Sequence, residues 1–334
     1  MKSYHFLFLL TILVISCNKK VAKLATLTTS DVFNISDSTA TINGVITDIG
    51  NSEITECGVV WSVNQNPTID DNSALDNINN DNTISIQISG LNAATNYFVR
   101  TYAKNEAGVS YGNEVTFNTT YTIVSNPGQP LVDINGNTYE TIELGNGQIW
   151  MAENLRASSC SNGTTIPNIV DDTIWVNLTT PGYSFYENNA NYDIPFGKLY
   201  NWNTVISCDV CPSGWRVPSL EDFNAFVDYL DPNASGTQMV NGAGSKMKII
   251  GTQYWVGSNS FATNESGFSA IPGGSRMNNG SFSLSFDRYA RYWTTSEDGS
   301  GIGAYHAFIS YSSGSLQSMG FYKSGGLSIR CIKE

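Results

Sequence analysis

One short stretch with clear helical periodicity constrains the fold more than any other feature, because the rest of the chain reads as strands and loops. Pro218 cannot continue a strand, and Ser219 directly after it stands where a helix N-cap is expected. Asp222, three residues further on, can complete a capping box by accepting the backbone N–H of the cap residue. Asp231-Pro232 then ends the helix.

The predicted helix has one apolar face. Its apolar side chains recur at spacings of three and four residues: Leu220, Phe223, Phe226, Val227 and Leu230. Asn224 lies off this face, and we expect it to point to solvent. A one-sided helix among strands must pack on a sheet, which predicts an α+β domain around residues 211–230.

The N-terminus has the features of an export signal. An apolar run over residues 6–15 follows a basic residue and is too short to span a bilayer. The run ends in Val14-Ile15-Ser16-Cys17, which resembles a bacterial lipobox. This resemblance implies that residues 1–16 are a lipoprotein signal peptide, that Cys17 carries the lipid anchor, and that residues 17–23 are a tether. An ordinary secretory signal with a chance cysteine is the alternative.

Lipidation of Cys17 would make a membrane the chain's first partner, at the outer membrane or the cell surface. Asn18-Lys19-Lys20 lacks the acidic run that resembles a surface-export signal in some such lipoproteins, so a periplasm-facing position stays open. The net charge of −12 argues against nucleic acid as a partner, because phosphate binding needs a basic patch.

Export gives the remaining cysteines a structural meaning, because disulfides form in oxidising compartments. The count after Cys17 is odd, so one thiol is left unpaired. Cys57 is alone in the first half of the chain, in an apolar strand, and we expect it to be the free one. Cys208 and Cys211 have the spacing of redox and zinc sites, but no helix starts at Cys208 and no second ligand pair follows. We therefore expect them to be structural.

Residues 24–119 alternate polar and apolar side chains in short runs between Asn-, Asp- and Ser-rich loops, as strands do. The segment Leu91-Asn-Ala-Ala-Thr-Asn-Tyr-Phe-Val-Arg100 resembles strand F of a fibronectin type III domain. The resemblance implies an all-β sandwich of about seven strands in which Tyr97 is a tyrosine corner, its hydroxyl tied to upstream backbone. Such domains are most often spacers or binding modules, and we expect this one to be a stalk. Residues 120–130, with Pro127-Gly128, read as a linker.

Residues 131–334 carry sequence blocks in a specific order: Gln148-Ile-Trp-Met-Ala-Glu-Asn-Leu-Arg156, Gly197-Lys-Leu-Tyr-Asn-Trp202, Cys211-Pro-Ser-Gly-Trp-Arg-Val-Pro218, Tyr292-Trp-Thr-Thr-Ser296 and Gly326-Leu-Ser-Ile-Arg-Cys331. In this order the blocks resemble the Fibrobacter succinogenes major paralogous domain. The chain departs from that family's pattern at Arg216, where His is usual, and at Tyr292, where Trp is usual.

That family looks like a relative of the formylglycine-generating-enzyme and C-type lectin-like folds. The resemblance implies an α+β C-type lectin-like domain with a small antiparallel sheet, one or two helices and long loops. It also implies a disulfide between Cys211, beside the helix, and Cys331, on the last strand. We expect a second disulfide between Cys160 and Cys208. The tryptophans of the shared blocks are expected in the core: Trp150, Trp202, Trp215 and Trp293.

The residues form no evident catalytic constellation. The relatives that oxidise a substrate cysteine need reactive thiols, and here Cys331 falls at a structural position. His306 is the one imidazole of the mature chain, and the acids Glu153, Glu265 and Asp287 stand singly in separate blocks. We therefore expect neither an enzyme nor a cofactor.

A lectin-type calcium site needs several oxygen ligands, including carboxylates. Trp293 is followed by Thr294-Thr295, which lack that charge, so we expect no metal. The loop acids Asp171-Asp172 and Asp231 are expected to be solvated.

Non-enzymatic binding or adhesion, with a glycan or a protein as ligand, is the function that these features favour for a cell-envelope lipoprotein. Aromatic rings stack on sugars and protein surfaces while Arg and Asn set the orientation. The candidate ligand-binding side chains are Trp255, Tyr254, Arg276, Arg291, Tyr305 and His306. A purely structural surface protein is the alternative, and an enzyme of unknown type comes third.

Overall fold

The fold was obtained as a computed structural model, which describes residues 21–77, 82–234, 242–257, 259 and 261–334. The chain divides into two compact units, of which the first ends at Thr122 and the second begins at Ile123. In the described part of the chain, no helix is long and apolar enough to cross a membrane. The predicted lipid anchor, Cys17, lies outside the described residues.

In its described residues, the first unit has strands and no helix. They are β1 Thr26–Phe33, β2 Thr39–Asp48, β3 Glu56–Ser62, β4 Asn72–Leu75, β5 Thr83–Ser89, β6 Asn96–Asn105, β7 Gly108–Tyr111 and β8 Val115–Asn118. One sheet has the order β1-β2-β5, and the other has the order β4-β3-β6-β7 with β8 also on β6. All pairings are antiparallel. The strands outnumber the expected seven because β7 and β8 share one edge of β6.

One core joins the two sheets into a β-sandwich. Alternate side chains of β2 and β5 meet those of β3 and β6: Ala40, Ile42, Ile84, Ile86, Ile88, Val59, Val99 and Ala103. This alternation buries one face of each strand and leaves the other to solvent. Cys57 is buried in this core as a free thiol, which confirms the prediction. The Tyr97 hydroxyl accepts the N–H of Asn92 at 3.0 Å, as a tyrosine corner does.

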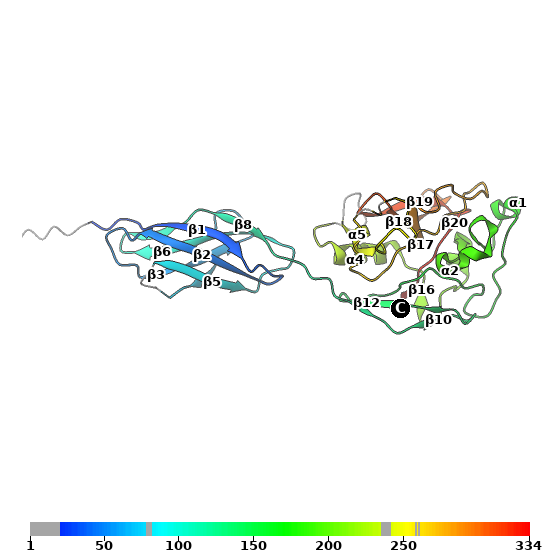
Figure 1. The fold of residues 1–334 in the computed structure, drawn as a ribbon, viewed down its shortest axis with the longest axis horizontal. Coiled ribbons are helices and arrows are strands. Elements are labelled where there is room, and N and C mark those ends of the chain that lie inside the picture. Colours follow the sequence, from blue (N-terminus) through cyan, green and yellow to red (C-terminus); the bar gives the residue numbers. More distant parts are fainter. Residues whose placement is uncertain (1–20, 78–81, 235–241, 258, 260) are drawn as a thin grey trace, which may run out of the picture. The chain divides into compact units, whose positions relative to one another are not determined.

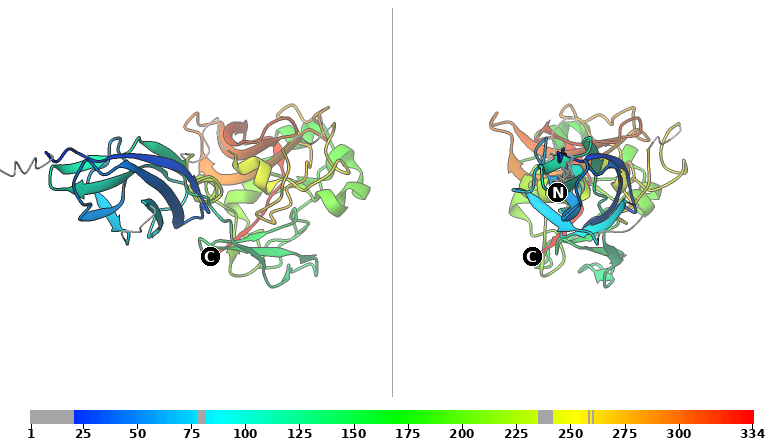
Figure 2. Two further views of the ribbon diagram at one scale, coloured as in Figure 1. Left: turned by 60° about the vertical axis from the view of Figure 1, so that its left-hand side comes forward. Right: turned by 90° about the vertical axis from the view of Figure 1, so that its left-hand side faces the viewer.

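The second unit combines small antiparallel sheets with short helices and long connections, which both views of Figure 2 show. Its strands are β9 Ser125–Pro127, β10 Leu131–Val132, β11 Thr138–Tyr139, β12 Thr141–Leu144, β13 Ile149–Met151, β14 Tyr183–Ser184, β15 Leu199–Asn201, β16 Trp215–Arg216, β17 Tyr289–Glu297, β18 Gly303–Ser310, β19 Leu316–Tyr322, β20 Gly326–Leu327 and β21 Ile332–Lys333. The largest sheet has the order β16-β21-β13-β12-β9, and smaller ones join β14-β15-β20, β17-β18-β19 and β10-β11.

The helices of the second unit are α1 Asp172–Val176, α2 Asp193–Phe196, α3 Trp202–Ser207, α4 Leu220–Leu230 and α5 Ala243–Met247, with 3-10 turns at Tyr186–Asn188 and Ala190–Tyr192. The predicted linker at 120–130 is corrected in part. Ser125–Pro127 pairs with β12 as the edge strand of the largest sheet, because its backbone N–H and C=O groups find partners there.

Helix α4 is the predicted helix. Ser219 accepts the N–H of Asp222, and the Asp222 carboxylate accepts the N–H of Ser219, so the capping box is complete. Arg216 adds a bidentate ion pair to that carboxylate, with N–O distances of 2.6 and 2.9 Å. The arginine that departs from the family pattern therefore supports the N-terminus of α4.

The apolar face of α4 packs on β17 and β18 (Figure 1). Phe223, Phe226, Val227 and Leu230 are buried, and the rings of Phe223 and Phe226 lie 4.9 and 5.2 Å from the ring of Trp150. Asn224 is half-buried, whereas we expected it to point to solvent.

Both predicted disulfides are present. Cys160 is bonded to Cys208, and Cys211 is bonded to Cys331. All four cysteines belong to one core cluster, which also contains Trp202 and Trp293. Trp150 is buried as well, in the core under α4, whereas Trp215 is only partly buried against the cystine-rich core.

The loop acids Asp171 and Asp172 are exposed, as predicted, and Asp231 is half-buried, but all three also have structural partners. Asp171 caps α1 by accepting the N–H of Ile174 at 2.9 Å. Asp172 forms an ion pair of 2.7 Å with Arg276. Asp231 accepts the N–H of Gly242. Each carboxylate satisfies a donor that a loop conformation would otherwise leave unpaired.

Candidate functional site

An acidic groove on the second unit is the arrangement best suited to hold a ligand. Two hollows of about 240 and about 330 Å³ share Glu140, Ala152 and Ser269, so they form one groove. Its side chains come from segments that are far apart in the sequence: Ser125, Asn126, Pro127, Glu140, Thr141, Ile142, Ala152, Glu153, Pro195, Ile249, Tyr254, Asn264, Glu265, Ser269, Ile271 and Arg330. Three of the lining residues are carboxylates and one is an aromatic ring.

Tyr254 provides the aromatic surface of the groove. The side chain is half-buried, and its ring meets the ring of Phe196 edge to face, with centroids 5.7 Å apart at 89°. Phe196 belongs to a wider set of half-buried rings that pack on one another: Tyr192, Phe282 and Phe286, with Tyr186 buried among them. These contacts fix the orientation of Tyr254 without covering the ring.

Glu153 and Glu140 stand together on one side of the groove. The Glu153 carboxylate accepts the backbone N–H of Glu140 at 2.8 Å and lies 3.6 Å from a guanidinium nitrogen of Arg156. Glu140 itself is exposed. One carboxylate is therefore held in place, and the other is free to move toward a ligand.

Glu265 is presented by a tight loop at the other end of the groove. The Asn264 amide oxygen accepts the N–H of Ser269 at 2.9 Å, and its amide nitrogen donates to the Ser269 hydroxyl at 3.0 Å. Asn264 and Ser269 both have positive φ angles, of 50° and 54°, which close the loop on itself. Glu265 remains exposed at its tip.

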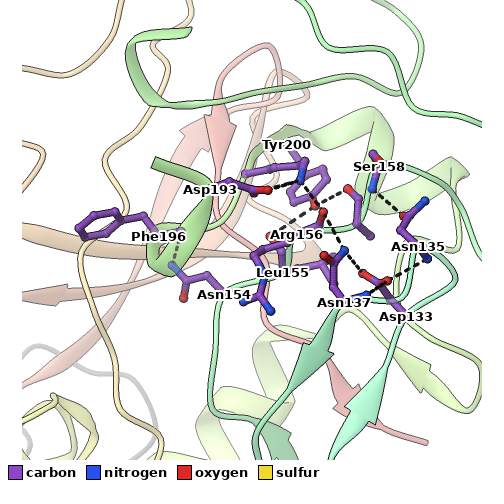
Figure 3. A network of polar contacts seen from close by, with 12 residues as sticks. Asp133, Asn135, Asn137, Asn154, Leu155, Arg156, Ser158, Asp193, Phe196 and Tyr200 are labelled. Atoms are coloured by element: carbon purple, nitrogen blue, oxygen red, sulfur yellow. Dashed lines mark hydrogen bonds and ion pairs between the residues drawn. The ribbon is translucent and has the colours of Figure 1, made fainter. Parts of the chain in front are cut away.

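A network of polar contacts joins residues 154–158, which follow Glu153 in sequence, to Asp193 and Phe196 (Figure 3). Asn154 donates to the carbonyl of Phe196 at 2.8 Å. Lys198 donates to the carbonyl of Arg156 and to the Asp193 carboxylate, at 3.0 Å from the nearer oxygen of that carboxylate. Burial lowers the pKa of Lys198, although the Asp193 carboxylate acts in the opposite direction.

The same network extends to the β10–β11 hairpin. Asp133 accepts hydrogen bonds from Asn135, from Asn137 and from the Tyr139 hydroxyl. Tyr139 in turn accepts the N–H of Arg156 at 2.9 Å. Asn137 and Tyr139 bond to the backbone of Arg156, and Tyr200 bonds to the backbone of Ala157, so the network holds in place the segment that follows Glu153.

Trp255 and Arg276 do not lie on a ligand-binding surface, which corrects the expectation for both. Trp255 is 2% exposed and donates to the carbonyl of Ala270. Arg276 is fully buried, stacks 4.4 Å above the ring of Trp175 and pairs with Asp172. Internal partners use the polar atoms of both side chains, so they hold loops in place.

The candidates Arg291, Tyr305 and His306 belong to the β17–β18–β19 sheet, apart from the groove. Arg291 and Tyr305 are half-buried. His306 is 2% exposed, which corrects its expected place on the surface. Burial, and secondarily the charge of Arg291, lower the pKa of His306 to about 3, so the ring is neutral at pH 7.

The sequence analysis named Tyr254 and two of the groove acids, Glu153 and Glu265. It did not predict that these residues line one groove. It missed Glu140 altogether. In the described residues, no group of three or more His, Cys, Asp or Glu side chains is arranged to hold a metal ion. Asp287 does not line the groove.

Comparison with known families and structures gives one informative match. The model of the Fibrobacter succinogenes major domain family matches residues 142–333, which is more than half of the chain. No curated protein matches the chain. Among solved structures, the sensor domain of the anti-sigma factor RsgI4 from Pseudobacteroides cellulosolvens shares 18% identity, over 29% of this chain and 96% of that one. Its TM-score of 0.23 is too low to support a structural argument.

Proposed function

Because the chain belongs to the Fibrobacter succinogenes major domain family, we propose that its second unit is a ligand-binding module and that the acidic groove binds a glycan without altering it chemically. The observation that carries this proposal is the meeting of the half-buried ring of Tyr254 with Glu140, Glu153 and Glu265 in one groove. Sugar rings stack on aromatic faces, and a few well-placed polar groups orient the ligand.

The charge of the groove favours a neutral glycan over an acidic one. Three carboxylates accept hydrogen bonds from sugar hydroxyls, whereas they repel a second anion. The net charge of −12 adds to this repulsion at long range. Asn126, Asn264 and Ser269 supply neutral donors and acceptors beside the carboxylates.

A glycan array probed with the protein, followed by calorimetric titration of the sugars that bind, tests the proposal. Tyr254→Ala should weaken binding at least about tenfold, because a central aromatic contact is typically worth more than about 1.4 kcal/mol. Tyr305→Ala is the matched control, because it removes the same half-buried side chain outside the groove. Absence of binding to every neutral glycan would instead favour a purely structural surface protein.

The three carboxylates also require a test for catalysis. The bound glycan should be recovered intact after long incubation, with no new reducing ends. Release of reducing sugar that disappears in Glu153→Gln would contradict simple binding and identify an acid-dependent hydrolase.

We infer further that the protein is a lipid-anchored component of the cell envelope. The Val14-Ile15-Ser16-Cys17 sequence supports the anchor, and the two disulfides fit an oxidising compartment. Cys17→Ala should abolish partitioning of the protein into the detergent phase with membranes. Equal partitioning of the variant and the parent would contradict lipidation.

Finer fold assignments support this picture. The sheet orders of the first unit and the Tyr97 hydrogen bond match a fibronectin type III-like sandwich, which we propose is a spacer. The bridge from Cys211 to Cys331 beside α4 supports a C-type lectin-like second unit. Deletion of residues 24–119 should leave the glycan affinity unchanged if the sandwich is only a spacer.

A further inference from the structure

Arg291 occupies an unusual position on the β17–β18–β19 sheet. Its guanidinium carbon lies 4.9 Å from the ring centre of Tyr289, 5.4 Å from that of Phe308 and 5.9 Å from that of Phe321. Arg291 is paired directly with Phe308 across β17 and β18. The half-buried rings therefore surround the guanidinium group and remove much of its water.

No carboxylate compensates the charge of Arg291 within the described part of the chain. None of the ion pairs involves this arginine, and its hydrogen bond goes from Nη1 to the neutral hydroxyl of Ser275, at 2.9 Å. Burial lowers the pKa of Arg291, which reflects the cost of holding the charge there. By contrast, the fully buried Arg276 has the carboxylate of Asp172.

The free edge of the guanidinium group has a specific shape. With Nη1 bound to Ser275, the atoms Nε and Nη2 remain, and neither belongs to the fully enclosed polar atoms of the described residues. These two N–H groups point in parallel, which matches the two oxygens of a carboxylate.

The neighbour of Arg291 on the same sheet face is His306, which brings no negative charge. The imidazole packs edge to face on Phe308 and Phe321, the same two rings that the guanidinium group of Arg291 approaches. The residue is 2% exposed, and the polar group beside its imidazole is the neutral backbone of Met319. The face therefore presents a positive charge without a carboxylate beside it, and any balancing anion must come from outside the described protein.

We propose that Arg291 is a binding site for a carboxylate group of a ligand, separate from the acidic groove. The carboxylate accepts hydrogen bonds from Nε and Nη2, and its carbon skeleton packs on the rings of Tyr289 and Phe308. The site binds monoanionic carboxylates such as those of sugar acids, because the parallel N–H groups of Nε and Nη2 fit a planar group. It does not depend on the function of the groove.

The test is a titration of the full chain with glucuronate, followed by calorimetry and by the NMR signals of the imidazole of His306. Glucose is the neutral control, and inorganic phosphate is the non-planar anion. The His306 signals are assigned by their loss in His306→Gln. Glucuronate should bind at least about tenfold more tightly than glucose or phosphate and should shift the His306 signals, because charged hydrogen bonds are the strong ones.

Arg291→Met should weaken glucuronate binding roughly 10- to 100-fold, because it removes both donors of the fork. Arg291→Lys keeps the positive charge but not the pair of parallel N–H donors, so it should lose an intermediate amount of glucuronate affinity. This variant also tests the site if Arg291→Met is poorly folded. Arg288→Met is the matched control, because Arg288 is an exposed arginine three residues before Arg291. This variant should bind glucuronate as tightly as the parent does. Equal affinity for glucuronate and glucose, tighter binding of phosphate, or unchanged binding in both Arg291 variants would each overturn the assignment.

Discussion

Replacement of Phe223 by alanine tests the packing of α4 on the second unit. The Phe223 side chain is fully buried, and its ring lies 4.9 Å from that of Trp150 at a tilt of 46°. Truncation of a buried Phe to Ala typically costs about 3 to 5 kcal/mol, through lost burial and the cavity left behind. The ring pair with Trp150 contributes about 0.5 to 1.5 kcal/mol of this, while the better helix propensity of alanine returns about 0.5 kcal/mol. We expect a net loss of about 3 to 4 kcal/mol in the free energy of unfolding.

Urea unfolding followed by tryptophan fluorescence measures this loss. Six of the seven tryptophans lie in the second unit, so the signal reports mainly on its unfolding. Phe223→Leu should cost less than about 1.5 kcal/mol, because it keeps most of the buried volume. Glu221→Ala removes an exposed side chain from the same helix and should change stability by less than about 1 kcal/mol. If Glu221→Ala were as damaging as Phe223→Ala, the apolar face would not be the packed one.

Three further predictions concern disulfides and pH. Replacing Cys211 and Cys331 by serine should lower the free energy of unfolding in urea melts by about 1 kcal/mol more than replacing Cys160 and Cys208 by serine. The reason is that the first bond closes a loop of 120 residues and the second a loop of 48. The reverse order would contradict the chain-entropy argument. Since the pKa of His306 is lowered to about 3 from 6.5, the folded state takes up its proton less readily than the unfolded state. Stability should therefore fall as the pH drops from 6.5 toward 3, by up to about 1.4 kcal/mol per unit, and thermal melts of His306→Gln should show a flatter profile. Burial raises the pKa of Asp222, but hydrogen bonds from Arg216 and Ser219 outweigh this effect and lower the pKa. The stability that this carboxylate contributes should therefore be present above pH 3.8 and lost below it. Acid melts of Asp222→Asn should lack that loss.

The features that the sequence predicted correctly are local ones. The capping box of α4 needs only Ser219 and Asp222, and its buried face follows from the helical repeat. The free thiol of Cys57 follows from its isolation in an apolar strand. The disulfide between Cys211 and Cys331 was not local, and it came from a resemblance to a family rather than from spacing.

The groove could not be predicted from the sequence, because it depends on how the long connections fold back on one another. Glu140, Glu153 and Glu265 are separated by loops whose paths are fixed by contacts such as Asn154 with Phe196, and no periodicity encodes these contacts. Tyr254 and Trp255 illustrate a finer limit. These two residues are adjacent in a segment of bends, yet the ring of Tyr254 lines the groove while the ring of Trp255 is buried in the core.

Arg276 and His306 show why polar residues in loops and strands are unreliable markers of a surface. Arg276 is compensated inside the protein by Asp172 and by stacking on Trp175. His306 is buried as the neutral ring, which removes the charge that would otherwise keep it at the surface.

The position of β21 has a consequence for biosynthesis. This strand follows the other elements of the second unit in sequence, yet it lies between β16 and β13 within the largest sheet, and Cys331 directly before it closes the bridge to Cys211. The earlier strands are synthesised first and wait with unpaired edges, so the sheet cannot close before Ile332–Lys333 has been synthesised. A nascent chain that stalls before this point exposes an incomplete sheet and the thiol of Cys211, whose partner Cys331 has not yet been made.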